Sequence, residues 1–243
     1  MPERPRASHL DLPPKRTQPP PTPLMKNLLP LCVVLLFSPI LNGAPLPEIQ
    51  PVLGQKGALL YASDFKAPNA KPTSRLTAAK AEIAGGLLQL HKLPEVSHPG
   101  IARISDAKDF PPVTDLLLEA DFRWPDKGGF NFQFKKPGRP EHGVPPEFYV
   151  SLSRSADPKR PVILQLADNA PRSVVGKREI TLDPETTHRI VIEVRNGEVA
   201  VQVDGGEPLR GPCNLASAPK SCPDIGFDNQ GVAFESIKIW SLR

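Results

Sequence analysis

The stretch of residues 188–206 constrains the fold more than any other, because it predicts a β-hairpin. Residues 190–194 place isoleucine or valine at every second position, which is the period of a strand with one buried face. Residues 199–203 repeat this alternation with valine. Asn196 and Gly197, between the two, tolerate positive φ at both central positions of a type I′ turn. The apolar face of this hairpin needs further strands to cover it.

The same alternation recurs from about residue 57 onward and predicts an all-β fold. Short strand patterns follow one another about every 8–15 residues, which favours an antiparallel arrangement. Parallel strands buried on both faces would instead show continuous apolar runs. The 32 prolines also fit a chain of short strands and turns. We expect a single antiparallel β-sandwich of the jelly-roll type. Besides the hairpin, the expected strands are 58–65, 80–90 with a turn at Gly85-Gly86, 101–104, 115–124, 130–136, 148–154, 161–167, 179–182, 225–227 and 232–242.

The N-terminal part of the chain predicts export. Residues 1–24 form a proline-rich leader that cannot bury a core, and they are either a long n-region or lie ahead of a translation start at Met25. Residues 25–44 combine a lysine, an apolar run and a small residue, the pattern of a secretory signal peptide. This run is shorter than the roughly 18 residues that span a membrane. The sequence predicts a secreted or periplasmic protein without a membrane span in the mature chain, with a linker at 45–56 and the sandwich at 57–243.

The net charge of the chain after residue 44 gives no support for nucleic acid as a partner. Residues 1–44 hold five of the 30 basic and two of the 26 acidic residues, so the remainder carries 25 against 24, a formal net charge of +1. The basic character of the full chain therefore belongs to its leader, and nothing indicates nucleic-acid binding. The two cysteines of the mature chain, Cys213 and Cys222, lie nine positions apart, and in an exported protein this predicts a short disulfide.

Glu119 and Asp121 are the sharpest catalytic candidates. Residues i and i+2 of a strand point to the same face about 6.5–7 Å apart. Glycoside hydrolysis uses two carboxylates about 5–5.5 or 6.5–9.5 Å apart. The alternative is that Arg123, on the same face, pairs with these carboxylates on an ordinary solvated strand. Both interpretations stay open.

A second candidate site is a polar face shared by neighbouring strands. If the strands pair in order, amide, hydroxyl, charged and aromatic side chains line up on one side of a sheet. Such a mixture of donors and acceptors suits a glycan or small sugar, although a solvated sheet face has a similar composition. The predicted ligand-binding residues are Arg123, Asn131, Gln133, Lys135, Tyr149, Ser151 and Gln165.

The order of these segments resembles the concanavalin A-like lectin/glucanase superfamily, and more closely the secreted bacterial 3-keto-disaccharide hydrolase and laminin-G-like jelly-roll domains. The resemblance implies a jelly roll and leaves three functions open: a carbohydrate-binding or structural domain, which we favour, a glycosidase-like hydrolase with Glu119 and Asp121 as its carboxylates, or a protein-interaction module. It rests on LLYASDF (59–65), AEIAGGLLQL (81–90), DLLLEADFRW (115–124), THRIVIEVRNGEVAVQVDGGEPL (187–209) and DIGFDNQGVAFESIKIWSL (224–242).

Two details qualify what the resemblance implies. Family-16 glucanases carry Glu-x-Asp-x-Glu, and here Arg123 stands where the second glutamate would be. Some members of the superfamily bind Ca²⁺ near the first and last strands, and Asp64 and Glu235 occupy similar places.

Overall fold

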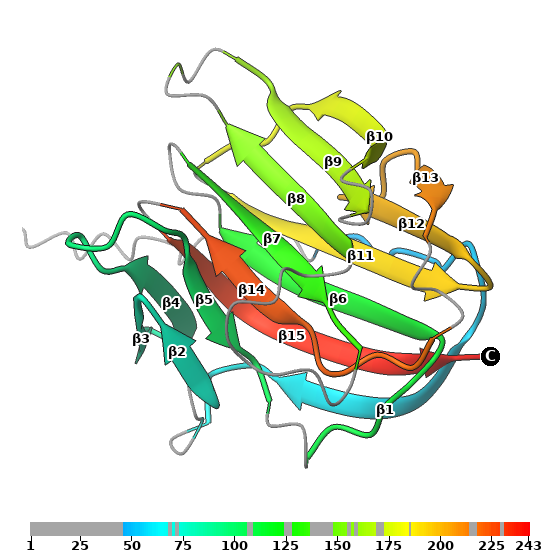
Figure 1. Cartoon of the computed structure of the whole chain (residues 1–243), viewed down its shortest axis with the longest axis horizontal. Coiled ribbons are helices and arrows are strands. Elements are labelled where there is room, and N and C mark those ends of the chain that lie inside the picture. Colours follow the sequence, from blue (N-terminus) through cyan, green and yellow to red (C-terminus); the bar gives the residue numbers. More distant parts are fainter. Residues whose placement is uncertain are drawn as a thin grey trace, which may run out of the picture. The chain divides into compact units, whose positions relative to one another are not determined.

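The computed structural model describes residues 46–67, 70, 73–105, 109–123, 128–136, 148–154, 157, 160–168, 173–184, 186–213, 218–228 and 231–243. These residues belong to one compact unit, Ala44–Arg243. They form two antiparallel sheets packed face to face, which confirms the predicted one-domain β-sandwich (Figure 1). The predicted leader and signal peptide lie outside the described residues. No helix within the described ranges is long and apolar enough to cross a membrane.

Sheet A has eight strands in the order β13-β12-β11-β6-β15-β4-β3, and β1 pairs with β15 beside β4. Its long central strands, β6 and β15, run antiparallel over most of their length. The strands are β1 (Lys56–Ser63), β3 (Ala79–Ala84), β4 (Leu87–Lys92), β6 (Leu116–Arg123), β11 (Thr187–Arg195), β12 (Glu198–Val203), β13 (Leu209–Pro212) and β15 (Val232–Leu242).

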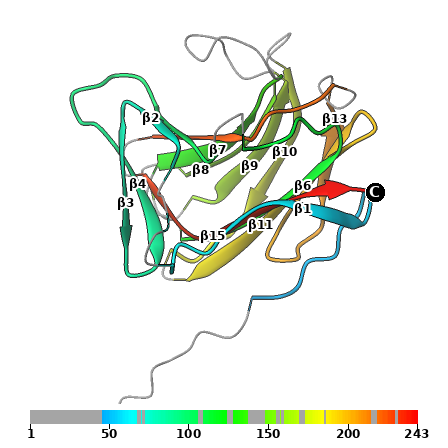
Figure 2. The ribbon, with the colours of Figure 1, turned by 90° about the horizontal axis from the view of Figure 1, so that it is seen from below.

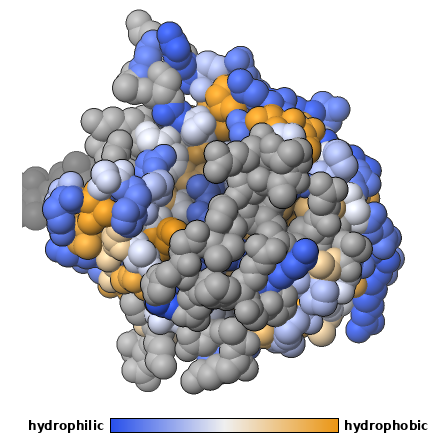
Figure 3. All heavy atoms as spheres, in the orientation of Figure 1, coloured by the Kyte–Doolittle hydropathy of each residue, from blue (hydrophilic) through white to orange (hydrophobic). Residues whose placement is uncertain are grey.

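Sheet B has seven strands in the order β10-β9-β8-β7-β14-β5-β2. These are β2 (Arg75–Thr77), β5 (Gly100–Arg103), β7 (Gly128–Phe134), β8 (Phe148–Arg154), β9 (Val162–Asp168), β10 (Ser173–Ile180) and β14 (Asp224–Phe227). The side of the molecule on which sheet B lies faces the viewer in Figure 3, and hydrophilic residues predominate among the coloured ones there.

Both predicted hairpins are confirmed. Strands β11 and β12 pair around Asn196 and Gly197, whose φ angles are 50° and 83°, as a type I′ turn requires. Strands β3 and β4 pair around Gly85 and Gly86, also with positive φ. Glycine and asparagine adopt this backbone conformation at little cost, so the turn residues set the register of each hairpin.

The core lies between the sheets and is rich in phenylalanine. Alternate residues of β7, from Phe130 to Phe134, point inward from sheet B. Phe130 meets Phe122 of β6 edge-to-face with ring centroids 5.1 Å apart, and it meets Phe234 of β15 at 5.6 Å. The period-2 alternation of the sequence therefore reports the inward face of each strand correctly.

The expected pairing of strands in sequence order is correct for β7, β8 and β9 but wrong for β6. Strand β7 pairs with β8 and β14, whereas β6 pairs with β11 and β15 in the other sheet. The chain crosses between the sheets after Arg123. As a result, the outward residues of β6 and those of β7 lie on opposite sides of the sandwich.

Residues 46–55, expected to be a linker, pack on the outer face of sheet A, and we call them the N-terminal strap. Figure 2 shows the strap on the side of sheet A that faces away from sheet B. Ile49 is 3% exposed and belongs to a small apolar cluster with Leu117, Val191 and Leu242. The Glu193 carboxylate accepts hydrogen bonds from the backbone N–H groups of residues 52 and 53 at 2.8 and 2.7 Å. The strap is thus part of the folded domain.

The predicted disulfide is not formed. Cys213 follows β13 in sheet A, Cys222 precedes β14 in sheet B, and both are buried thiols. Burial raises the pKa of the Cys222 thiol to about 12, with the nearby carboxylate of Asp224 adding to the effect. Each cysteine therefore contributes to the apolar core as a small hydrophobic residue.

Candidate ligand-binding face

The outer face of sheet B brings most of the predicted ligand-binding residues together. In the register of the sheet, Asn131 of β7 lies opposite Ser151 of β8, which lies opposite Gln165 of β9. Two residues further along β7, and on the same face, Gln133 lies opposite Tyr149 of β8. Neighbouring strands are about 4.8 Å apart, so these side chains form polar rows that run across the strands. Lys135, two residues beyond Gln133, points to the same face.

Strand β14 adds two residues that the sequence analysis missed. Asp224 lies opposite Gln133, and Gly226 lies opposite Asn131. A Cβ atom at Gly226 would lie only 2.3 Å from Nε2 of Gln133 and 2.7 Å from Oδ1 of Asn131. The two amide side chains therefore extend over the glycine, which leaves them room. Asp224 and Gly226 flank the apolar Ile225, so the alternation of the sequence already indicates that these two residues face outward.

Asp224 is the centre of an ion cluster at one end of this face. Its carboxylate accepts from Nε of Arg103 at 3.1 Å and from Nζ of Lys135 at 2.8 Å. The Asp224 side chain is only 4% exposed, whereas those of Arg103 and Lys135 are each 17% exposed. The negative charge thus lies beneath two cationic groups that remain partly accessible.

Asn131 has a buried acceptor without a donor. Its Oδ1 atom is shielded from solvent and has no hydrogen-bond partner within the described part of the chain. A buried polar atom left unpaired costs roughly 1–3 kcal/mol.

Glu119 and Asp121 lie on the other side of the molecule, on the outer face of sheet A. The Asp121 carboxylate accepts from Nε and Nη2 of Arg189 at 2.6 and 3.0 Å, and from Oγ of Ser236 at 3.0 Å. Glu119 accepts from Nζ of Lys56 at 3.0 Å. Both residues are at most 9% exposed. The Arg189 side chain also donates to the carbonyl of Pro47, so the strap completes this network of ion pairs.

Arg123 is separated from the other predicted ligand-binding residues because it belongs to sheet A. Its Nη2 atom lies 2.9 Å from Oε1 of Glu235, which also accepts from Oγ1 of Thr187 at 2.6 Å. Asp64 follows β1, on the opposite edge of β15 from β6, and accepts from the backbone of Lys66 at 3.2 Å. Among the described residues no group of three or more His, Cys, Asp or Glu side chains converges, so the predicted Ca²⁺ ligands Asp64 and Glu235 have no surrounding cluster.

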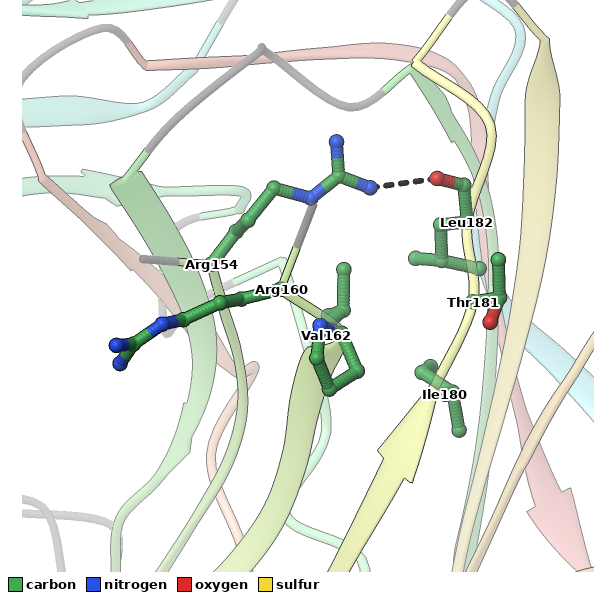
Figure 4. A pocket seen from close by; sticks show the side chains of 7 residues that line it. Arg154, Arg160, Val162, Ile180, Thr181 and Leu182 are labelled. Carbon is green, nitrogen blue, oxygen red and sulfur yellow. Dashed lines mark hydrogen bonds between the residues drawn. The ribbon is translucent and has the colours of Figure 1, made fainter. Parts of the chain in front are cut away.

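A pocket of about 240 Å³ lies where β8, β9 and β10 end or begin, away from the polar rows. Nη2 of Arg154 donates to the carbonyl of Leu182 at 2.5 Å along its wall. Figure 4 shows that the guanidinium of Arg160 points away from this contact. The lining residues are Arg154, Arg160, Pro161, Val162, Ile180, Thr181 and Leu182. None of the predicted site residues takes part.

No family model and no curated protein matches this sequence. Solved structures do match in fold. A Bacillus subtilis protein of unknown function with a galectin-like fold superposes with a TM-score of 0.59 at 12% identity, covering 79% of this chain and 100% of the other. The laminarinase from Rhodothermus marinus gives 0.55 at 10% identity, with 79% and 100% coverage. The CBM2 module of the evolved Dit protein of Lactobacillus casei BL23 phage J-1 gives 0.54 at 11%, with 79% and 99% coverage.

These similarities confirm the fold expected from the sequence. Galectin-like proteins and family-16 glucanases share the concanavalin A-like jelly roll, and two antiparallel sheets of this chain superpose on it. At 10–12% identity the similarity establishes the fold alone.

Proposed function

From the concanavalin A-like fold of this chain, we propose that it is a non-catalytic carbohydrate-binding domain whose ligand lies on the outer face of sheet B. The observation that carries this proposal is the alignment of Asn131, Gln133, Tyr149, Ser151 and Gln165 across three adjacent strands. Several solved structures with this fold are named as a carbohydrate-binding module or as glucanases, which favours the same ligand class.

The chemistry of the face suits sugar hydroxyl groups. Each hydroxyl both donates and accepts, and the amides of Asn131 and Gln133 offer both kinds of partner side by side. Tyr149, which is half-buried, adds an aromatic ring next to the amides for packing against the apolar face of a sugar ring.

The contacts of Glu119 and Asp121 disfavour the hydrolase alternative. A glycosidase needs its two carboxylates to flank one bond of a bound substrate. Here both carboxylates are nearly buried and are bound by Arg189 and Lys56, and Arg189 also donates to the carbonyl of Pro47 in the strap. We infer that they stabilise sheet A and its strap.

Binding to a glycan array, followed by calorimetry on the best ligand, tests the proposal. We expect Tyr149→Ala and Gln133→Ala to weaken binding about tenfold each, because they remove a stacking ring and a buried hydrogen-bond partner. Glu119→Gln, matched in burial but on the other sheet, should bind as the unmodified domain does. Hydrolysis of 3-keto-glycosides that stops in Glu119→Gln while the fold stays intact would overturn the non-catalytic assignment, and a chain that binds no glycan would overturn the proposal as a whole.

We further propose that the domain acts outside the cytoplasm, on the basis of the signal peptide predicted at residues 25–44. Expression with and without these residues, followed by cell fractionation, tests this. Export should depend on residues 25–44 and not on residues 1–24.

A further inference from the structure

We propose that the N-terminal strap can leave its own sheet A and bind sheet A of a second copy, so that two chains exchange straps and form a symmetric dimer. The partner is therefore a second copy of this chain. The contact surface is the outer face of sheet A under the strap, which we call the strap-binding face: Arg189, Glu193, Arg195, Gln202 and the apolar residues Leu117, Val191 and Leu242.

The strap-binding face recognises mainly the backbone of the strap. Arg189 and Gln202 donate to strap carbonyl groups at 3.2 and 3.1 Å, and Glu193 accepts from two strap N–H groups at 2.8 and 2.7 Å. Among the ten strap residues, all of which the structure describes, only Ile49 is buried. None of these contacts depends on how the chain continues after the strap, so the strap of a second copy can form them equally well.

The chain reverses its direction between the strap and β1. The strap runs in the same direction as β11, because Arg189 binds residue 47 and Arg195 binds residue 53. Strand β1 runs the opposite way, since β1, β15, β6 and β11 are successively antiparallel. Figure 2 shows this return of the chain beside the C-terminus. A short reversing connection is a hinge at which elements exchange between copies, because straightening it directs the element away from its own domain.

The hinge is crowded at Gly54. A Cβ atom there would lie 2.3 Å from Nη1 of Arg195 and 2.9 Å from the carbonyl oxygen of Arg243. Any side chain at position 54 therefore opposes the folded-back hinge. It does not oppose an extended hinge, because residue 54 then leaves the space between these two groups. Residues 53–55 span about 10 Å when extended, so the two copies meet at the ends of their A sheets.

The balance between the two forms depends on protein concentration. The strap makes the same contacts in both forms, so the forms differ in the hinge and in the freedom lost on association. A strap on a short connection has an effective concentration of about 1 mM at its own sheet. We therefore expect the unmodified protein to be monomeric at about 50 μM, and exchange to dominate where the hinge cannot fold back.

Size-exclusion chromatography with light scattering on a hinge variant is the first test. Gly54→Val should be mainly dimeric at about 50 μM, because its side chain disfavours the folded-back hinge. Gly57→Val is the matched control. This glycine lies on β1, where a Cβ atom would also be crowded, at 2.6 Å from Oγ of Ser241, but it is not part of the hinge. Gly57→Val should stay monomeric.

Mixing two complementary variants tests the exchange itself. Ile49→Asp spoils the strap and leaves the strap-binding face intact, whereas Glu193→Ala combined with Gln202→Ala spoils the face and leaves the strap intact. We expect each variant to be monomeric alone and an equimolar mixture at about 50 μM to form a 1:1 dimer. Leu59→Asp, an exposed site outside the strap, replaces Ile49→Asp in the control mixture and should give no dimer, because its own strap fills its face.

A peptide of residues 46–55 should dissociate the mixed dimer, and the same peptide with Ile49→Asp should not. Thermal unfolding verifies each variant, and Ile49→Ser takes the place of Ile49→Asp if the latter does not fold. A mixture of folded variants that stays monomeric overturns the exchange. A Gly54→Val dimer that persists after adding Ile49→Asp also overturns it, because such a dimer would not use the strap.

Discussion

His188 holds together three segments at one end of sheet A. Its Nδ1 atom lies 2.6 Å from Oδ2 of Asp204, and its Nε2 atom lies 2.7 Å from the carbonyl of Asp183. The imidazole therefore joins the start of β11 to the turn after β12 and to Asp183 and Thr186. Burial on its own lowers the pKa of His188, but hydrogen bonds to Asp204 and Asp183, with the charges of these residues, outweigh it and raise the pKa above the usual 6.5.

This raised pKa gives the protein a pH dependence of stability. The His188–Asp204 pair should stabilise the fold fully below pH about 6.5, and this contribution should be lost as the pH rises through the raised pKa of the folded state. Asp204→Asn removes the charge but keeps an acceptor for the backbone N–H of Arg189 and tolerates the positive φ of 52° at this position. Urea unfolding of both proteins at pH 5.5 and pH 9 should show a larger difference at pH 5.5. A difference that is the same or larger at pH 9 would contradict the assignment.

Gly226 determines where the amides of the candidate site lie. Gly226→Ala should displace the ends of the Gln133 and Asn131 side chains, which are the atoms that a Cβ would meet, and should leave the backbone in place. We expect glycan affinity to fall by about tenfold with a change in stability of about 1–2 kcal/mol. Calorimetry and urea unfolding measure the two effects. Unchanged affinity in a folded variant would mean that the amides over Gly226 do not contact the ligand.

At the scale of elements, the strap accounts for the burial of the outward residues of β6, and these residues in turn hold the strap on sheet A. Three outward residues of β6 meet the strap or its neighbours. Leu117 packs under the strap, and the carboxylates of Glu119 and Asp121 bind cations near it. A segment with little regular structure is thereby held against the sheet, with Ile49 buried and its other residues partly or fully exposed. Backbone groups of the strap form most of the polar contacts, including Gln50 O with Gln202 and Leu53 O with Arg195.

If the strap is part of the fold, Ile49→Ala should destabilise the domain by about 2–3 kcal/mol, the usual cost of removing a buried isoleucine side chain. Leu59→Ala on β1 is the control, because Leu59 is 56% exposed and its truncation should cost about 0.5 kcal/mol or less. Urea-induced unfolding followed by tryptophan fluorescence measures both. If Ile49→Ala and Leu59→Ala both reduced the stability by the same small amount, residues 46–55 would be a linker and not part of the fold.

The sequence predicted elements where local chemistry determines them. Alternation and turn residues identified the two hairpins and the strands that became β6 to β9, because both signals lie within a few adjacent residues. Strands β2 and β13 were missed, since they have only three and four residues. Strand β10 was expected at residues 179–182 and spans Ser173–Ile180, because an irregularity between Val174 and Gly176 interrupts its alternation.

The candidate site was predictable only in part for a related reason. Alternation shows which residues of a strand point outward, and this placed Asn131, Gln133, Tyr149, Ser151 and Gln165 correctly on one face. It does not show which strands become neighbours. The insertion of β14 between β7 and β5 and the position of β6 in the other sheet depend on contacts between distant parts of the chain, and no short-range signal encodes them.

At the scale of the whole molecule, the two buried thiols report on the integrity of the sandwich. Cys213 and Cys222 are 3% and 5% exposed, and the Cys222 pKa of about 12 keeps that group protonated at neutral pH. Because the thiolate is the reactive form, we expect neither cysteine to react with iodoacetamide in the folded protein. Both should become alkylated in 6 M guanidinium chloride without a reductant, as measured by intact mass.

Two results would contradict this prediction. Alkylation of the folded protein would indicate an opening of the sandwich, and protection in denaturant that is lost on adding a reductant would indicate a disulfide. A variant with Cys222→Ser identifies which thiol reacts.

The exchange of backbone hydrogen bonds between Gln55 and Arg243 has a practical consequence. It joins the C-terminus to the end of the strap, and the strap lies against sheet A from the carbonyl of Pro47 onward. Both ends of the folded domain are therefore on the sheet opposite to the proposed ligand face. A tag at the C-terminus would tether the protein to a biosensor surface with sheet B directed into the solution, an orientation suited to measuring weak glycan binding.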